Sequence, residues 1–205
     1  MSTYFQFSME SPQLLNFVIA NFSLGFILFL IGIFVLSRNL KNPINQIFAT
    51  YSFSIAWWSL FTIPLITSSN AQAGYFWDQV CLSGAVFIPT TFFHFVLVFL
   101  RRVKKNIAYI LGCYLLSVLF FVLNWTGFFV KEVQPNNVFN FYTVPSLAYT
   151  CFVSYFSLLS TVSVFLLFRA VKQGSEKPRF LKQIKWLFWA SCFGYVGGGT
   201  NFLLV

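Results

Sequence analysis

Charged residues in this chain fall into a few clusters, and the stretches between them are long, apolar and uncharged. After Glu10 the next charge is Arg38, and the later clusters lie at Lys41, Asp78, 101–105, 131–132 and 169–185. The hydrocarbon core of a bilayer is about 30 Å thick, and a helix needs about 20 apolar residues to cross it. The intervals are therefore long enough to span a membrane as helices.

In lipid, only helices and the strands of closed barrels satisfy their own backbone hydrogen bonds. Barrel strands alternate apolar and polar residues over about ten positions, whereas the apolar runs here are continuous. The chain is 58% hydrophobic and 8% charged, against about 25% charged residues in soluble proteins. The sequence therefore predicts an all-α fold, a polytopic bundle of transmembrane helices.

The basic residues predict the topology of this bundle. We expect six helices, at 13–36, 43–67, 75–100, 107–129, 146–168 and 184–204. Twelve of the thirteen Lys and Arg residues then lie in the loops 37–42, 101–106 and 169–185, all on one side. Because basic loops stay in the cytoplasm, both chain ends are predicted outside. Residues 1–12 would form an extracytoplasmic tail, and 13–205 one membrane domain.

The start of the chain and its net charge are explained by the same topology. The first apolar run lacks the positively charged start of a signal peptide and is too long for one, so we expect it to remain as an anchor. The net charge of +9 comes from the loops, which favours anionic lipid headgroups over nucleic acid as their partner. The lipid bilayer is the expected partner, and nucleic acid is not.

Two residues of the third expected helix are candidates for detecting a signal. His94 is the single histidine and lies about 10 Å inside the inner boundary, a depth at which ionisable groups are costly and often functional. Its alternative is a neutral imidazole bonded to a helix neighbour and packed among phenylalanines. Pro89 removes one helical hydrogen bond and bends the helix. That bend is either fixed or the pivot of a moving helix.

Further candidates lie in the second and last helices. Trp57 and Trp58 fall near the middle of the second helix, deep for tryptophan, and either line a pocket or fill the core. Gly194 and Gly198 form a GxxxG pair, which predicts close packing against another backbone. A ligand site or hinge around Gly198 and Asn201 is the alternative.

Asp78 and the cysteines have structural interpretations. Asp78 is expected in the first turn of the third helix, where a carboxylate suits the helix dipole. Cys81 and Cys151 both lie near the outer side, so they are either free or paired, a choice that depends on geometry. We find no metal-ligand spacing, no serine–histidine–acid set, no HExxH motif and no phosphate-binding glycine loop. We therefore expect no catalytic residue, cofactor or metal, and no enzyme activity, in this chain.

Several segments carry a resemblance to a known family. Residues 42–49 read Asn-Pro-Ile-Asn-Gln-Ile-Phe-Ala, and residues 56–60 read Ala-Trp-Trp-Ser-Leu. The stretch 75–95 contains a glycine, Pro89 and a Phe-Phe-His-Phe sequence, and the basic stretch 182–186 leads to Gly-Gly-Gly-Thr-Asn-Phe-Leu. Over residues 13–205 these features resemble the seven-transmembrane sensor region at the N-terminus of bacterial histidine kinases.

The resemblance implies a signal-input domain in the bacterial cytoplasmic membrane. Such a domain detects a small stimulus, unknown here, by shifting its helices, with a homodimer as one expected assembly. In that family a seventh helix returns the chain to the cytoplasm, where a histidine kinase or diguanylate cyclase output domain follows. With six helices expected, we predict a chain truncated before the seventh helix, either a fragment or a short relative.

Two other functions compete with this hypothesis. A small transporter or pore subunit needs polar groups that face each other near the midplane, for which Asn21, Asn124 and His94 are the candidates. A membrane scaffold that only binds partner proteins is the second alternative. A seventh helix and a kinase core encoded in frame after codon 205 would favour the sensor.

Overall fold

The computed structural model describes residues 12–136, 138–174 and 177–199. Its helices are α1 (Pro12–Arg38), α2 (Pro43–Ile66), α3 (Ala71–Ala85), α4 (Ile88–Phe99), α5 (Val103–Trp125), α6 (Leu147–Gln173) and α7 (Pro178–Gly199). The strands β1 (Val130–Gln134) and β2 (Tyr142–Pro145) pair antiparallel. The predicted all-α membrane bundle is confirmed, and the hairpin between α5 and α6 was not predicted.

Five segments of the described chain are long and apolar enough to cross a membrane, with α3 and α4 counted together as one. They correspond to the first five predicted spans. The sixth corresponds to α7, whose first half carries Arg179, Lys182 and Lys185. Residues 200–204, which complete that predicted span, lie outside the described residues.

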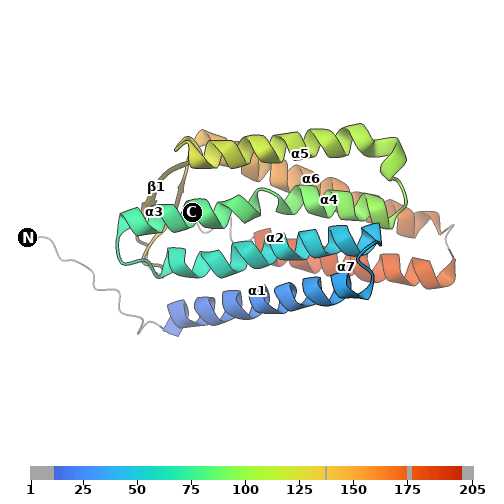
Figure 1. Ribbon diagram of the computed structural model, residues 1–205, viewed down its shortest axis with the longest axis horizontal. Coiled ribbons are helices and arrows are strands. Elements are labelled where there is room, and N and C mark those ends of the chain that lie inside the picture. Colours follow the sequence, from blue (N-terminus) through green and yellow to red (C-terminus); the bar gives the residue numbers. More distant parts are fainter. Residues whose placement is uncertain (1–11, 137, 175–176, 200–205) are drawn as a thin grey trace, which may run out of the picture.

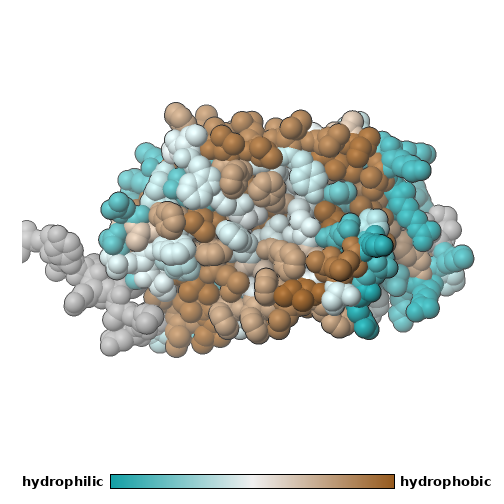
Figure 2. Space-filling view, in the orientation of Figure 1, coloured by the Kyte–Doolittle hydropathy of each residue, from teal (hydrophilic) through white to brown (hydrophobic). Residues whose placement is uncertain are grey.

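The helices run side by side along the long axis of the molecule (Figure 1). The hairpin and the α2–α3 turn lie at one end, called the hairpin end. The α1–α2, α4–α5 and α6–α7 connections lie at the opposite end, called the basic end. Figure 2 shows hydrophilic surface gathered at the basic end and hydrophobic surface over the middle. The predicted basic loops therefore do share one end of the bundle.

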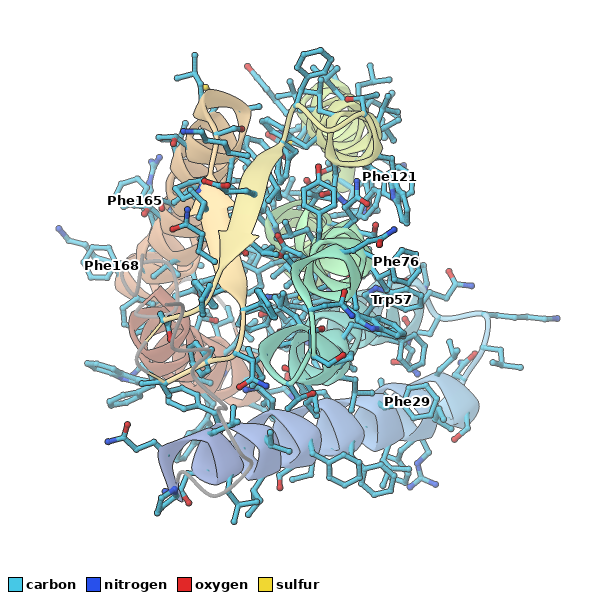
Figure 3. The ribbon with its side chains drawn as sticks, turned by 90° about the vertical axis from the view of Figure 1, so that its left-hand side faces the viewer. Phe29, Trp57, Phe76, Phe121, Phe165 and Phe168 are labelled. Atoms are coloured by element: carbon cyan, nitrogen blue, oxygen red, sulfur yellow. The ribbon has the colours of Figure 1, made fainter. Side chains whose placement is uncertain are left out.

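Large apolar side chains cover the outside of the bundle. Phe29, Trp57, Phe76 and Phe121 project outward from four different helices, as Figure 3 shows, and each is at least 36% exposed. On the other side of the bundle, Phe165 and Phe168 of α6 also point away from the core (Figure 3). Contiguous apolar surface of this kind is stable against lipid tails and not against water. The chain is a multi-pass membrane protein.

The third span is broken rather than bent. α3 ends at Ala85, α4 begins at Ile88, and Pro89 sits in the first turn of α4, where a missing amide costs nothing. The amides of Val86 and Phe87 close the end of α3 on the carbonyls of Leu82 and Gly84, at 3.1 Å each. The predicted bend at Pro89 is thus a two-residue interruption between separate helices.

Glycines allow close helix contacts, but not where the GxxxG pair predicted them. A Cβ on Gly25 of α1 would lie 2.7 Å from Leu60 of α2, and one on Gly84 of α3 would lie 2.5 Å from Trp57. A Cβ on Gly194 meets nothing within 4 Å. The prediction that Gly194 packs against another backbone is therefore wrong within the described chain.

Candidate functional site

A small cavity with both polar and apolar walls lies between α1, α2 and α3, beneath the hairpin. It has a volume of about 40 Å³ and is called the hairpin-end cavity. Its lining residues are Phe17, Asn21, Trp58, Thr62, Leu65, Ile66, Asp78, Cys81, Leu82, Phe139, Tyr142, Thr143 and Tyr149. The hairpin is held over the cavity because the backbone amide of Asn140 donates to the Ile66 carbonyl at the end of α2, at 3.0 Å.

Asp78 contributes a half-satisfied carboxyl group to this cavity. Its side chain is 1% exposed. Its Oδ1 accepts a hydrogen bond from the Thr143 hydroxyl of β2 at 2.9 Å. Its Oδ2 is buried and has no hydrogen-bond partner among the described residues. Because a buried polar atom left unpaired costs free energy, Oδ2 is a candidate position for a bound water or ion.

The other polar groups of the cavity include the Asn21 amide, which donates to the Phe17 carbonyl at 2.9 Å, and hydroxyl and thiol groups. The Thr62 hydroxyl donates to the Trp58 carbonyl at 2.8 Å and lies 3.3 Å from the Cys81 sulfur. Burial raises the pKa of Tyr142 in β2 to about 12, with smaller contributions from Cys81 and Asp78. Tyr142 therefore remains a neutral hydroxyl at physiological pH.

The expected position of Asp78 in the first turn of the third helix is wrong. The cap of α3 is Asn70, whose Oδ1 accepts from the Ala73 amide at 2.9 Å. Asp78 then lies about two turns inside the helix. The signal in the sequence was Ser-Ser-Asn before Ala71, because asparagine and serine are preferred N-cap residues. With the cap placed there, Asp78 becomes an acid inside a membrane span.

Hydroxyl groups bridge the interruption between α3 and α4. The Ser117 hydroxyl of α5 donates to the Val86 carbonyl at 3.0 Å, and its oxygen lies 2.7 Å from that of Thr90. The Thr90 hydroxyl also lies 2.6 Å from the Tyr155 hydroxyl of α6. Three helices therefore meet at the break through the hydroxyl groups of Thr90, Ser117 and Tyr155.

A larger apolar groove runs along the other side of the break. Its volume is about 540 Å³. It is lined by Leu24, Leu28, Phe48, Tyr51, Ile55, Trp58, Ala85, Ile88, Phe92, Phe95, Phe156, Leu187, Ala190, Ser191, Phe193, Gly194 and Tyr195. Residues on both sides of the interruption, Ala85 and Ile88, contribute to it. This space is called the apolar groove.

The two predicted tryptophans have different surroundings. Trp57 is 45% exposed on the outer face and donates its indole N–H to the Val80 carbonyl of α3 at 2.8 Å. Trp58 is partly buried and lines both the hairpin-end cavity and the apolar groove. The structure thus places Trp58 against the cavity and the groove, and Trp57 on the exposed outer face.

His94 contacts α5 rather than its own helix. Its Nδ1 lies 3.2 Å from the Tyr114 hydroxyl, and the two rings meet edge to face. Asn124 donates to the Gln79 carbonyl of α3 at 2.7 Å, and Asn21 lines the hairpin-end cavity. Within the described residues no hydrogen bond links these three side chains, so the polar groups considered for a transport path are separate.

The remaining predicted positions are the two cysteines and the glycine and asparagine near the end of the chain. Cys81 is buried in the hairpin-end cavity, Cys151 is exposed on α6, and both are free thiols, so the disulfide considered between them is not formed. Gly198 lies within α7, and Asn201 lies outside the described residues. No group of three metal-ligating side chains occurs in the described part of the chain.

Comparison with known proteins agrees with the architecture. A family model described as the N-terminal 7TM region of histidine kinase matches residues 21–203. No curated protein matches the chain. The match extends from within α1 past the end of α7 and includes the broken helix, the groove and every cavity-lining residue except Phe17. The chain therefore belongs to this family, the membrane-embedded sensor regions found at the N-terminus of histidine kinases.

Proposed function

We propose that this chain is the input region of a bacterial sensor in the cytoplasmic membrane, and that it detects an apolar small molecule in the apolar groove. The groove volume of about 540 Å³ lies within the roughly 300–1,000 Å³ of small-molecule sites. Its walls are mostly aliphatic and aromatic side chains, so a ligand that partitions into lipid gains most from it. That groove, lying across a helix break, is the observation that carries the proposal.

A ligand in the groove acts on the angle between α3 and α4. Ala85 and Ile88 line the groove from either side of the interruption, where Val86 and Phe87 interrupt the helix. A stimulus shifts a conformational equilibrium only by its difference in affinity for two arrangements. A ligand that contacts both helices has a different affinity for each arrangement. A change in the angle between α3 and α4 alters its contacts with one helix relative to its contacts with the other.

The change reaches α7 through aromatic contacts. The Tyr195 ring of α7 lies 4.9 Å from the Phe92 ring of α4 and 6.0 Å from the Phe156 ring of α6, centroid to centroid. Movement of α4 therefore displaces α7. We propose a cytoplasmic output domain, of histidine kinase or diguanylate cyclase type, as the receiver of that displacement, with the N-terminus of the chain outside the cell.

Binding is tested with a dibrominated fatty acid as the probe, in nanodiscs that contain the chain, because bromine quenches indole fluorescence on contact. We expect a saturable part of the quenching in the wild type. Trp58→Phe should remove that part, and the matched variant Trp57→Phe should keep it. Equal loss of quenching in the two variants would contradict binding in the groove.

Function is tested by filling the groove in the full-length sensor. Gly194 lines the groove and a Cβ there meets nothing within 4 Å, so Gly194→Leu should fold and occupy the space of the ligand. Gly112→Leu is the matched control, since a Cβ on Gly112 of α5 also meets nothing within 4 Å. The proposal is supported if the output of Gly194→Leu no longer changes when the ligand is added and the output of Gly112→Leu changes as in the wild type. A normal response in both rejects it.

A further inference from the structure

The hairpin-end cavity is a second site, separate in chemistry from the apolar groove. Asp78 is the one acidic residue inside the described membrane-spanning segments. Ionisable side chains at such positions are rare and are paired with another group. Among the described residues no basic side chain forms an ion pair with Asp78, and its Oδ2 has no hydrogen-bond donor. The carboxyl group therefore has no partner for Oδ2 among the described residues, and the cavity beside it has room for one.

The surroundings restrict what that partner is. The Thr143 hydroxyl donates to Oδ1 at 2.9 Å, and Oδ2 has no hydrogen-bond donor among the described residues. The cavity volume of about 40 Å³ exceeds the roughly 10–15 Å³ that one water needs. It falls far short of the roughly 300 Å³ of an organic ligand site. An ion with one or two waters, or a single ammonium group, fits this space.

The charge and number of ligands restrict it further. One carboxylate with hydroxyl oxygens around it balances a single positive charge. Calcium takes six to eight oxygen ligands with several carboxylates, and the described residues contain no cluster of three metal-ligating side chains. Oxygen donors favour hard cations over soft transition metals, and the single carboxylate favours a monovalent one among them.

We infer that the hairpin-end cavity binds a small monovalent cation, sodium or an ammonium group, between Oδ2 of Asp78 and the hydroxyl group of Thr62. The hairpin closes the site, because Thr143 of β2 holds the carboxylate while Asn140 ties the hairpin to α2. The bound cation stabilises the packing of α2, α3 and the hairpin. This inference does not depend on the apolar groove.

The purified chain in detergent tests the inference through its thermal unfolding midpoint. It is measured in sodium chloride, ammonium chloride and N-methylglucamine chloride at equal ionic strength. We expect a midpoint about 3 °C higher in at least one of the first two salts than in the third, whose cation is too large for the cavity. A rise with sodium alone identifies an inorganic ion. A rise with ammonium identifies a site for an amine group.

Two acidic residues provide a matched pair of variants. Asp78→Asn should remove the difference between the salts, because the amide keeps the size of the carboxylate without its charge. Glu132→Gln changes an exposed acid of the hairpin that bonds to Gln134 at 2.8 Å, and it should keep the difference. Thr143→Val should reduce it. Equal unfolding midpoints of the wild type in all three salts would overturn the inference, and this measurement needs no variant. A difference between the salts that persists in Asp78→Asn would also overturn it.

Discussion

At the residue scale, His94 and Tyr114 form a polar contact between α4 and α5 in the half of the bundle nearest the basic end. The distance of 3.2 Å from Nδ1 to the hydroxyl oxygen is within the range of a hydrogen bond. Such bonds between membrane helices contribute on average about 0.6 kcal/mol. The pair is therefore weak enough to break when α4 moves.

We predict that His94→Ala and Tyr114→Phe both reduce the signalling output of the full-length sensor. Each substitution removes the same contact, and Tyr114→Phe keeps the edge-to-face ring packing, so the two should agree in direction. Output activity in membranes is measured beside the amount of inserted protein, which should not change. Wild-type output from both variants would exclude this contact from the mechanism.

At the scale of elements, the break between α3 and α4 is stabilised by hydroxyl groups from two neighbouring helices. Ser117 satisfies the Val86 carbonyl at the interruption and lies against Thr90. Backbone groups that leave the helical pattern inside a membrane need such partners. The broken helix therefore depends on α5 for its geometry.

Ser117→Ala should lower the free energy of unfolding by about 1 kcal/mol, because it leaves a buried carbonyl and a buried hydroxyl without this partner. Ser154→Ala is the matched control, since its exposed hydroxyl donates to the Thr150 carbonyl of its own helix at 3.0 Å and should matter little. Both are measured by denaturation with sodium dodecyl sulfate in mixed micelles. Equal effects would show that the break does not need Ser117.

At the scale of the whole molecule, the basic end and the hairpin end are chemically different faces. The hydrophilic surface of Figure 2 is concentrated at the basic end, where three connections meet. Because basic loops remain in the cytoplasm, this end is predicted inside and the hairpin outside. The hairpin-end cavity would then be close to the extracytoplasmic medium and the break deeper in the membrane.

A membrane-impermeant maleimide tests this orientation in cells from which the outer layers have been removed and in which the cytoplasmic membrane is intact. Glu132→Cys on the hairpin should react at once, and Lys172→Cys at the end of α6 should react only after permeabilisation. Both side chains are exposed, so accessibility reports the side of the membrane. The opposite order of labelling would reverse the topology, and equal labelling from outside would contradict the alternating spans.

Sequence patterns alone determined the membrane class, the approximate spans and the shared end of the basic loops. In lipid each span must form its own backbone hydrogen bonds, so runs of apolar residues identify helices without knowledge of their neighbours. The position of the interruption near Pro89 was also predicted, because proline removes a helical hydrogen bond. It was expected as a bend and not as a break between two helices. The hairpin was missed because its two strands are short and follow an apolar run that continues α5.

Only the tertiary structure decided which polar residues matter together. Asp78 is joined to Thr143, and Thr90 to Tyr155, each across 65 positions of the chain. No periodicity or spacing predicts such pairs, because they depend on how helices pack side by side. Trp57 and Trp58 are adjacent in sequence, yet one faces lipid and the other lines both cavities. Successive helical positions point about 100° apart, and the neighbouring helices determine what each of them meets.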